Sequence, residues 1–396
     1  MSAGRLWDKG GSLDAKILAF TVGSDPILDL RLVPFDIHAS IAHVQMLGSC
    51  GHLAADEADA LVKGLESVGA DFKAGKWSIE TSQEDCHTAI EYHLTERLGP
   101  LGGKVHLGRS RNDQVLTAIR LFLKAEIGAA RGRLSALLEA FDRLIAAQGS
   151  IAIPGYTHTQ QAMPSSVALW AGGFSGELAS CAALLDAAWA LADQSPLGSA
   201  AGYGTPGLTL DRAETARLLD FSKVQEPVTA AQLSRGKAES ALGFALVQIL
   251  GDLGRLAADI CLFASQEFGF VRLDDDVSTG SSIMPQKRNP DVFELIRGHA
   301  TQAQADLLAL LGLTTGLSSG YHRDLQLMKE ALFRLVDRGA AVMEIAAYAL
   351  GRIHFDAARA AEITTPGIHA AERAFTLVQS EGISFREAYR RVAAEG

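Results

Sequence analysis

The segment "DQVLTAIRLFLKAEIGAARGRLSALLEAFDRLIAA", residues 113 to 147, predicts a single very long helix. Its apolar side chains recur at steps of three and four residues, which places them along one face of a helix. These side chains are Val115, Ile119, Phe122, Leu123, Ile127, Leu134, Leu137, Leu138, Phe141, Leu144 and Ile145. Four more alanine-rich segments show an amphipathic pattern of this kind, at 167–191, 238–267, 292–313 and 325–350. Because strand-like alternation is scarce, we predict an all-α fold, a bundle of long helices.

The chain is too long, at 396 residues, for one compact core, so we expect two or three packed units. Boundaries near Leu107 and Gly351 would give an N-terminal helical domain (1–107), a central long-helix bundle (108–351) and a short C-terminal helical domain (352–396). The apolar faces of the long segments are broad enough for burial on more than one side. We therefore expect helical bundles that pack on each other in a homo-oligomer.

Composition excludes several classes of protein. The formal net charge of −10 argues against a general nucleic-acid or membrane-surface binder, so an anionic substrate would need a local cluster of basic and amide groups. The four cysteines lie far apart without metal-site spacing, which fits reduced thiols in a cytoplasm. We expect no signal peptide in "MSAGRLWDKGGSLDAK" and no membrane span, because no uninterrupted apolar stretch is long enough.

Glycine- and proline-rich breaks between the helices carry the polar motifs. They are "GPLGGKVHLGRSRND" (99–113), "IPGYTHTQQAMP" (153–164), "SPLGSAAGYGTPG" (195–207), "LDDDVSTGSSIMPQKRNP" (273–290) and "LSSGYHRDLQ" (317–326).

The only two asparagines of the chain, Asn112 and Asn289, both lie in breaks that open helices. Asparagine is a common helix N-cap, and Pro290 and Asp291 fit the start of a helix. Serine, threonine or aspartate could cap as well, so an amide at both places also fits the binding of a carboxylate. Both interpretations stay open.

The break at 279–290 has two interpretations. Gly280 and the small residues after it can direct several backbone N–H groups at an anion, and a serine there could act as a base if Lys287 and the amides supply positive potential. The alternative is a flexible serine-rich connector. Ile283 and Met284 favour a lid that docks onto an apolar surface. The preceding Asp274–Asp276 triplet fits a solvated acidic turn better than a metal site.

His158 is expected to lie just before a helix, among the hydrogen-bonding side chains of Thr157, Gln160 and Gln161. A lone histidine is usually structural, and this chain has eleven. Glu294 could orient the imidazole and raise its basicity.

Four motifs together resemble the argininosuccinate lyases, a branch of the fumarase/aspartase superfamily. They are "GRSRNDQ" (108–114), "GYTHTQ" (155–160), "GSSIMPQKRNPD" (280–291) and "YHRDLQ" (321–326). The loop with "SSIMP" marks the superfamily, "GRSRNDQ" points to this branch, and the resemblance runs over most of the chain.

The resemblance implies a three-domain, largely helical homotetramer with a central helical bundle and active sites shared between subunits. It implies an enzyme that uses no metal or organic cofactor. From the charge, the cysteine spacing and the lack of a long apolar stretch, we expect a cytoplasmic protein that binds neither nucleic acid nor membrane. The implied substrate is argininosuccinate, cleaved to arginine and fumarate by anti β-elimination, the last step of arginine biosynthesis.

The resemblance also implies roles for the motif residues. Ser281 would be the catalytic base on a mobile loop, while Lys287 and Asn289 would hold the carboxylate next to the acidic C–H bond. His158, supported by Glu294, would be the partner acid or would position it.

The remaining residues would bind the substrate. Arg111, Asn112 and Thr157 would hold the succinyl carboxylates. A further wall of the site would consist of Tyr321, Arg323, Gln326 and Lys329.

This chain departs from the family pattern at positions expected to bind the amino-acid end of the substrate. Many members carry "YNKDLQEDKE" where this chain has "YHRDLQLMKE" (321–330), and an N-terminal Asn-Ser-Ser is replaced by "GSD" (23–25). Ser24 is therefore a weaker ligand candidate, and Arg323 keeps a positive charge with a different geometry. The C-terminal unit is shorter than usual.

Two alternatives remain. Another fumarate-releasing C–N lyase would act on adenylosuccinate or an aminopolycarboxylate, and "GRSRNDQ" speaks against it. A non-catalytic, crystallin-like homologue is the other, although Ser281, His158, Lys287 and Asn289 are all present.

Overall fold

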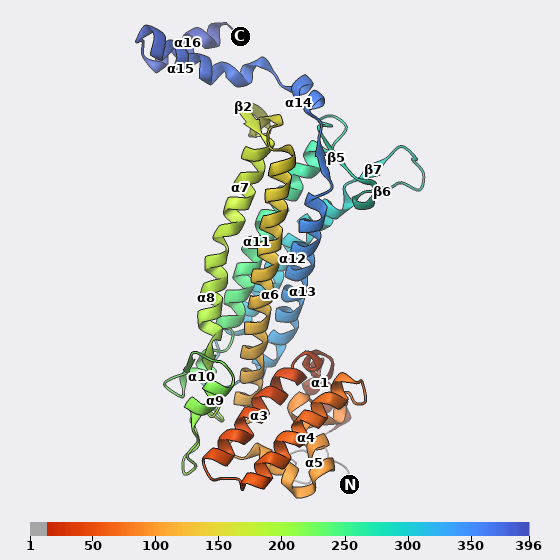
Figure 1. The fold of residues 1–396 in the computed structure, drawn as a ribbon, viewed down its shortest axis with the longest axis vertical. Helices are drawn as coiled ribbons and strands as arrows, with labels where there is room; N and C mark the ends of the chain where they lie inside the picture. Colours follow the sequence, from red (N-terminus) through yellow and green to blue (C-terminus); the bar gives the residue numbers. More distant parts are fainter. Residues whose placement is uncertain (1–13, 396) are drawn as a thin grey trace. The chain divides into compact units, whose positions relative to one another are not determined.

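The computed structural model describes residues 14–395, and 69% of it is helical, which confirms the all-α prediction (Figure 1). Helices occupy all five of the predicted long helical segments, four of them as single long helices. These helices are α6 (Arg111–Gln148), α7 (Val167–Ser180), α8 (Ala182–Ala192), α11 (Lys237–Phe263), α12 (Asp291–Leu313) and α13 (Met328–Leu350). The segment expected as one helix at 167–191 forms two, because the chain turns at Cys181 between α7 and α8.

The length of α6 follows from its composition. Its 38 residues contain no proline and many alanines and leucines, which are strong helix formers. Phe122, Ile127, Leu134 and Phe141 are at most 3% exposed, so the predicted apolar face is buried along most of the helix.

The chain forms two compact units, each made of three separate chain segments. Unit 1 comprises residues 1–129, 183–245 and 305–336, and unit 2 comprises 130–182, 246–304 and 337–396. The division falls within α6, α11, α12 and α13, so each of these helices contributes to both units. The three-domain division predicted from sequence stays a prediction.

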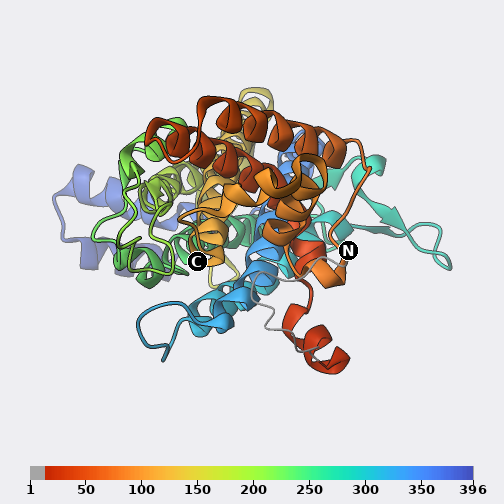
Figure 2. The ribbon, with the colours of Figure 1, turned by 90° about the horizontal axis from the view of Figure 1, so that it is seen from below.

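Unit 1 contains a group of helices that pack against each other, α3 (Val33–Ser49), α4 (Ala55–Lys73) and α5 (Cys86–Leu98) (Figures 1 and 2). Their contact surfaces are aliphatic, with Leu47, Leu61, Leu65 and Leu94 fully buried. Gly64 lets α4 approach α5 closely, since a Cβ there would lie 2.7 Å from Leu94 Cδ1.

Unit 1 also contains shorter elements. They are α1 (Ala15–Val22), α2 (Asp25–Leu28), η1 (Asp29–Arg31), η2 (Thr81–Gln83), η3 (Gly99–His106), α9 (Arg212–Leu218), α10 (Ala230–Leu233), η5 (Arg323–Leu327) and the parallel pair β3 (Gln194–Ser195) and β4 (Lys223–Val224).

Unit 2 contains the antiparallel hairpin β1 (Ala152–Thr157) and β2 (Gln160–Ser166), where sequence reasoning expected His158 to lie just before a helix. That expectation is wrong, since the next helix, α7, begins only at Val167. Gly155 permits the close pairing, because a Cβ there would lie 2.9 Å from the Met163 carbonyl oxygen. Aromatic rings join the hairpin to the end of α11 and the segment after it, with Tyr156 centred 6.1 Å from Phe263 and 5.6 Å from Phe268.

Other elements of unit 2 are short. They are the antiparallel pairs β5 (Val271–Leu273) with β8 (Ile353–Phe355) and β6 (Thr279–Gly280) with β7 (Arg288–Asn289), then η4 (Asp275–Val277), α14 (Ala357–Ile363), η6 (Pro366–His369), α15 (Ala370–Glu381) and α16 (Phe385–Ala394).

One segment, 167–192, is long and apolar enough to cross a membrane by length and composition alone. It is broken at Cys181 and carries Glu177 and Asp186, so its apolar surface also fits packing against other helices. The N-terminal segment expected to lack a signal peptide lies mostly outside the described residues.

Candidate functional site

A cavity of about 180 Å³ in unit 1 gathers charged side chains from distant parts of the chain. Its lining is Asp25, Asp29, Asp85, His87, Arg111, Asn112, Val115, Arg235, Tyr321, Arg323, Gln326 and Lys329. We call it the unit 1 pocket. It brings together six of the residues that the sequence singled out, from "GRSRNDQ" and from the segment 321–329.

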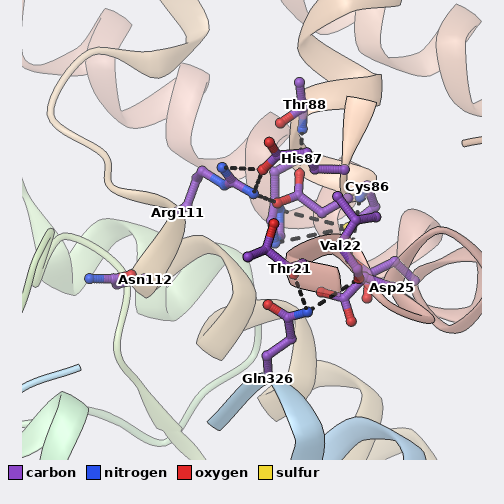
Figure 3. Close-up of polar contacts among 12 residues, drawn as sticks. Thr21, Val22, Asp25, Cys86, His87, Thr88, Arg111, Asn112 and Gln326 are labelled. Atoms are coloured by element: carbon purple, nitrogen blue, oxygen red, sulfur yellow. Dashed lines mark hydrogen bonds and ion pairs between the residues drawn. The ribbon is translucent and has the colours of Figure 1, made fainter. Parts of the chain in front are cut away.

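The first turn of α6 supplies Arg111 and Asn112 to the pocket. Buried Asp113 holds this turn in place, since its carboxylate accepts the N–H groups of Ser110, Gly198 and Ala200 at 2.9–3.0 Å. Burial raises the pKa of Asp113 to about 6. Asn112 is the second residue of α6 rather than its cap, and Figure 3 shows its side chain pointing away from the polar network.

Arg111 is already paired inside the protein. Its guanidinium contacts Glu84 Oε2 at 3.3 Å and the Asp85 carboxylate (Figure 3). Burial alone would lower the pKa of Arg111, but Asp85 and Glu84 outweigh it and raise it. A ligand carboxylate at Arg111 therefore competes with two acidic side chains.

Two candidate residues of the 3-10 helix η5 form hydrogen bonds with the C-terminal end of α1. Gln326 Nε2 donates to the carbonyl oxygens of Thr21 and Val22 at 3.0 and 3.2 Å (Figure 3). Arg323 Nη2 donates to the carbonyl oxygen of Thr21 at 2.9 Å. These are carbonyls of the last turn of α1, which lack partners within the helix. Arg323 Nε also donates to Gln326 Oε1 at 3.1 Å.

Lys329 lies buried between two carboxylates. Its Nζ is 2.9 Å from Asp25 Oδ2 and 2.6 Å from Asp29 Oδ1, and the residue is only 3% exposed. Burial alone would lower the pKa of Lys329, but the two aspartates raise it strongly. Burial raises the pKa of Asp25 to about 6 although Lys329 opposes the shift. Ser24 is exposed and does not line the pocket.

Sequence reasoning missed half of the lining, namely Asp25, Asp29, Asp85, His87, Val115 and Arg235. The titratable run "EDCH" (84–87) was a signal that could have found Asp85 and His87. Arg235 is 5% exposed, and its Nε and Nη1 have no hydrogen-bond partner among the described residues. Its guanidinium lies 5.8 Å from the Tyr321 ring centre. Burial lowers the pKa of Arg235.

One group among the described residues has metal-ligand geometry, Asp36, Cys86 and His87, whose ligand atoms lie within 4.8 Å of one another. His87 Nδ1 and Asp36 Oδ2 are 2.8 Å apart. Burial alone would lower the pKa of His87, but Asp36 and other carboxylates raise it. Burial also raises the pKa of the Cys86 thiol, which disfavours the thiolate that a metal needs. The geometry fits a buried ion pair.

Unit 2 holds the candidate serine on the segment 281–287 between β6 and β7, which Figure 1 shows reaching out beyond these strands. Ser281 Oγ accepts the backbone N–H groups of Ile283 and Met284 at 3.3 and 3.1 Å. Ile283 is 86% exposed. Gly280 lies in an extended strand opposite Arg288, so its φ does not require glycine, contrary to expectation.

Lys287 and Asn289 follow on the same segment. Lys287 is exposed, and Asn289 Nδ2 lies 3.5 Å from Thr279 Oγ1. Asn289 belongs to β7 and α12 begins two residues later, so it is not adjacent to the helix start.

The preceding acidic triplet is ion-paired. Asp274 contacts His354 at 2.8 Å, Asp275 contacts Arg288 at 3.2 Å and Asp276 contacts Arg352 at 2.7 Å. These contacts fit the solvated acidic turn expected from sequence.

His158 and Thr159 form the two-residue turn of the β1–β2 hairpin, after Thr157 at the end of β1. Both turn residues have positive φ, +54° and +60°, which is unusual for side chains with a Cβ and costly for a β-branched threonine. His158 is exposed at this tip. The Glu294 carboxylate, in the first turn of α12, contacts Arg297 at 4.0 Å rather than His158.

The candidate residues thus divide into two groups. None of the unit 2 candidates is among the described residues that line the unit 1 pocket. Those candidates are Thr157, His158, Ser281, Lys287, Asn289 and Glu294.

Comparisons with known proteins extend over nearly the whole chain. A family model described as "Lyase" matches residues 21–305. The argininosuccinate lyase of Thermotoga neapolitana is 41% identical over 389 residues, 98% of this chain and 97% of that protein. That of Stenotrophomonas maltophilia is 45% identical over 395 residues, 98% of this chain and 90% of that protein. A solved structure of an EDDS lyase variant with bound fumarate has a TM-score of 0.81 at 25% identity, covering 97% of this chain and 76% of that one.

Proposed function

The chain belongs to the argininosuccinate lyase family, and from this premise we propose that it cleaves argininosuccinate to arginine and fumarate. The enzyme is a carbon–nitrogen lyase that acts on a small molecule. We place it in the last step of arginine biosynthesis, in the cytoplasm.

The observation that carries the proposal is the composition of the unit 1 pocket. It joins the start of α6, the segment 321–329 and the "EDCH" run around one cavity, with Arg111, Arg235, Arg323 and Lys329 as cations and three aspartates as anions. Argininosuccinate carries carboxylates, a guanidinium and an α-ammonium group. A pocket lined by both cationic and anionic side chains suits such a substrate better than a pocket lined by cations alone.

Ser281 is the base in this proposal. Elimination begins with removal of a proton next to a carboxylate, which creates a dianionic aci-carboxylate, and the C–N bond to the guanidinium nitrogen then breaks. A serine hydroxyl can accept that proton only as an alkoxide. The N–H groups of Ile283 and Met284 already point at Ser281 Oγ, and hydrogen bonds to an oxygen favour its charged form. Lys287 adds positive potential, and with Asn289 it holds the carboxylate whose charge develops.

His158 acts as the partner acid or positions it, with Glu294 in support, and Thr157 binds a succinyl carboxylate with Arg111 and Asn112. To support His158 in this way, the Glu294 carboxylate has to move away from Arg297, which it contacts in the structure. The strained backbone at the tip of the β1–β2 hairpin supports a positional role for His158, since such strain concentrates at functional sites.

We further propose a homotetramer whose active sites combine segments of different subunits. Apolar side chains are exposed on the long helices of both units, which supports burial against further copies. They include Leu169 on α7, Phe244 on α11, Leu295, Leu308 and Leu311 on α12, and Ile345 on α13. The described residues that line the unit 1 pocket all belong to unit 1. This supports the proposal that segments of another subunit complete the active site.

The test is the appearance of fumarate, followed by its ultraviolet absorbance, when purified protein meets argininosuccinate. Adenylosuccinate and aspartate are the control substrates. Fumarate release from a control substrate but not from argininosuccinate would show a different C–N lyase, and release from none would favour a non-catalytic homologue.

A further inference from the structure

The tip of the β1–β2 hairpin is strained, and its backbone alone places the His158 side chain. His158 and Thr159 have φ angles of +54° and +60°, in the left-handed region that favours glycine and asparagine. No side chain in the described part of the chain forms a hydrogen bond or an ion pair with the exposed His158 imidazole. A strained backbone of this kind persists only where the surrounding structure over-determines it.

Gln161, which follows the tip on β2, supplies such a constraint. Its Nε2 donates to Ile363 O at 2.7 Å, and its Oε1 accepts the Thr365 N–H at 2.8 Å and the Thr365 hydroxyl at 3.1 Å. Ile363 is the last residue of α14, where carbonyl groups lack partners within the helix, and Thr365 directly precedes η6. One half-buried amide therefore joins the hairpin to the segment 363–365 between these two helices.

The segment 363–365 is itself fastened to the part of unit 2 that packs on the hairpin. Arg359 on α14 donates from Nε to Phe268 O at 2.9 Å and from Nη2 to Glu267 O at 2.8 Å. The Phe268 ring is centred 5.6 Å from the ring of Tyr156, and Tyr156 pairs with Gln161 across the hairpin. These contacts form a closed circuit, so the hydrogen bonds of Gln161 restrict the movement of the strands next to the tip.

We propose that Gln161 is a positioning residue, which holds the hairpin tip against the segment 363–365 and so fixes His158 for the reaction. The assignment rests on the proposed function, in which His158 is the partner acid or positions it. Gln161 contacts no reacting group in this assignment and acts through His158. Misplacement of a catalytic group by about 1 Å lowers the rate on the order of a hundredfold.

Replacement of Gln161 by leucine removes all three hydrogen bonds and keeps a side chain of similar size. The kcat for cleavage of argininosuccinate should fall on the order of tenfold to a hundredfold, with a smaller change in KM. Gln379→Leu, at an exposed position on α15, is the matched control and should keep the kcat of the wild type. In a His158→Asn background, Gln161→Leu should cause no further fall in kcat, because the group on which Gln161 acts is already absent.

The partner side of the contact gives a reciprocal test. Thr365→Pro removes both donors to Gln161 Oε1, and the φ of −85° at this position is close to the range that proline adopts. This variant should also lower kcat. The double variant with Gln161→Leu should be no slower than Gln161→Leu alone, since both changes break the same contact.

Gln161→Glu adds a pH signature. Its carboxylate has no proton to donate to Ile363 O and faces that oxygen directly, whereas a protonated carboxyl group can donate there and still accept from Thr365. The ratio of the kcat of this variant to that of the wild type should therefore rise as the pH is lowered towards the pKa of the carboxyl group. The same ratio for Gln379→Glu should stay constant.

Three results would each overturn the assignment. They are a wild-type kcat for Gln161→Leu, a further fall of the same factor in the His158→Asn background, and multiplying effects of Gln161→Leu and Thr365→Pro. These results leave the proposed function intact as long as the wild type releases fumarate from argininosuccinate. A wild type that releases none overturns the proposed function and the assignment with it. Thr365→Pro and Gln161→Glu keep the test available if Gln161→Leu does not fold.

Discussion

Replacing Lys329 by methionine should destabilise the protein in a pH-dependent way. The substitution keeps a long aliphatic side chain and removes the ammonium that lies 2.9 Å from Asp25 and 2.6 Å from Asp29. Because Lys329 is only 3% exposed, water cannot replace its ammonium as the partner of the two carboxylates. Removing one partner of a buried ion pair costs about 3–5 kcal/mol, and this is the loss expected near about pH 8.

The loss should shrink in mild acid. Asp25 has its pKa raised from 3.8 to about 6, so its contribution to stability is fully present below 3.8 and is lost as pH rises through about 6. Near about pH 5 most Asp25 is protonated, and Lys329 then compensates Asp29 alone. The cost of Lys329→Met should therefore be about 1–2 kcal/mol smaller near about pH 5 than near about pH 8.

Urea denaturation at fixed protein concentration measures both losses. Lys63→Met, at an exposed position on α4, is the matched control and should change stability by less than about 0.5 kcal/mol at either pH. An unchanged urea midpoint for Lys329→Met, or an equal loss at both pH values, would refute the assignment of Lys329 as the shared counter-ion.

Other perturbations test the chemistry and the assembly. Ser281→Ala should lower turnover, followed by fumarate absorbance, on the order of a thousandfold while substrate still binds, and Ser282→Ala should have a milder effect. Near-normal turnover of Ser281→Ala together with an inactive Ser282→Ala variant would contradict the role of Ser281. Lys287→Met should weaken both binding and rate, seen as a higher KM together with a lower kcat. Mixed tetramers of Ser281→Ala and His158→Asn chains should recover some activity after verified subunit exchange, and no recovery would mean that each chain builds its own site. Activity should persist in a chelator, and its loss with restoration by a divalent cation would contradict the metal-free mechanism.

The long helices could be predicted because their signal is local. The apolar repeat of α6 lies within one continuous segment, and buried Phe122, Ile127 and Phe141 follow it. The β1–β2 hairpin could not be predicted in this way. Its strands, "AIPGYT" and "QQAMPSS", contain Pro154 and Pro164 and lack alternation, and their pairing is decided by contacts across the hairpin.

The motif residues of the unit 1 pocket were named from sequence, but their partners were not. Arg111 was expected to face a ligand, and its contacts with Glu84 and Asp85 depend on a segment far away in the chain. Arg235 lies in "LSRGKAE" (233–239), which has no feature that separates a pocket arginine from a surface one. Its burial is a property of the packed structure alone.

Several features that destabilise the fold occur in the unit 1 pocket and at the β1–β2 hairpin tip. They support a functional role for these places independently of sequence similarity. Arg235 is buried with two nitrogens that have no partner in the part of the chain that the structure describes, Asp25 carries a raised pKa, and His158 and Thr159 adopt strained backbone angles. The fold itself does not require them, since aliphatic contacts hold α3, α4 and α5 together. Because proteins tend to break local rules where a ligand or a reaction benefits, these features support the proposal that the unit 1 pocket and the β1–β2 hairpin tip are each functional.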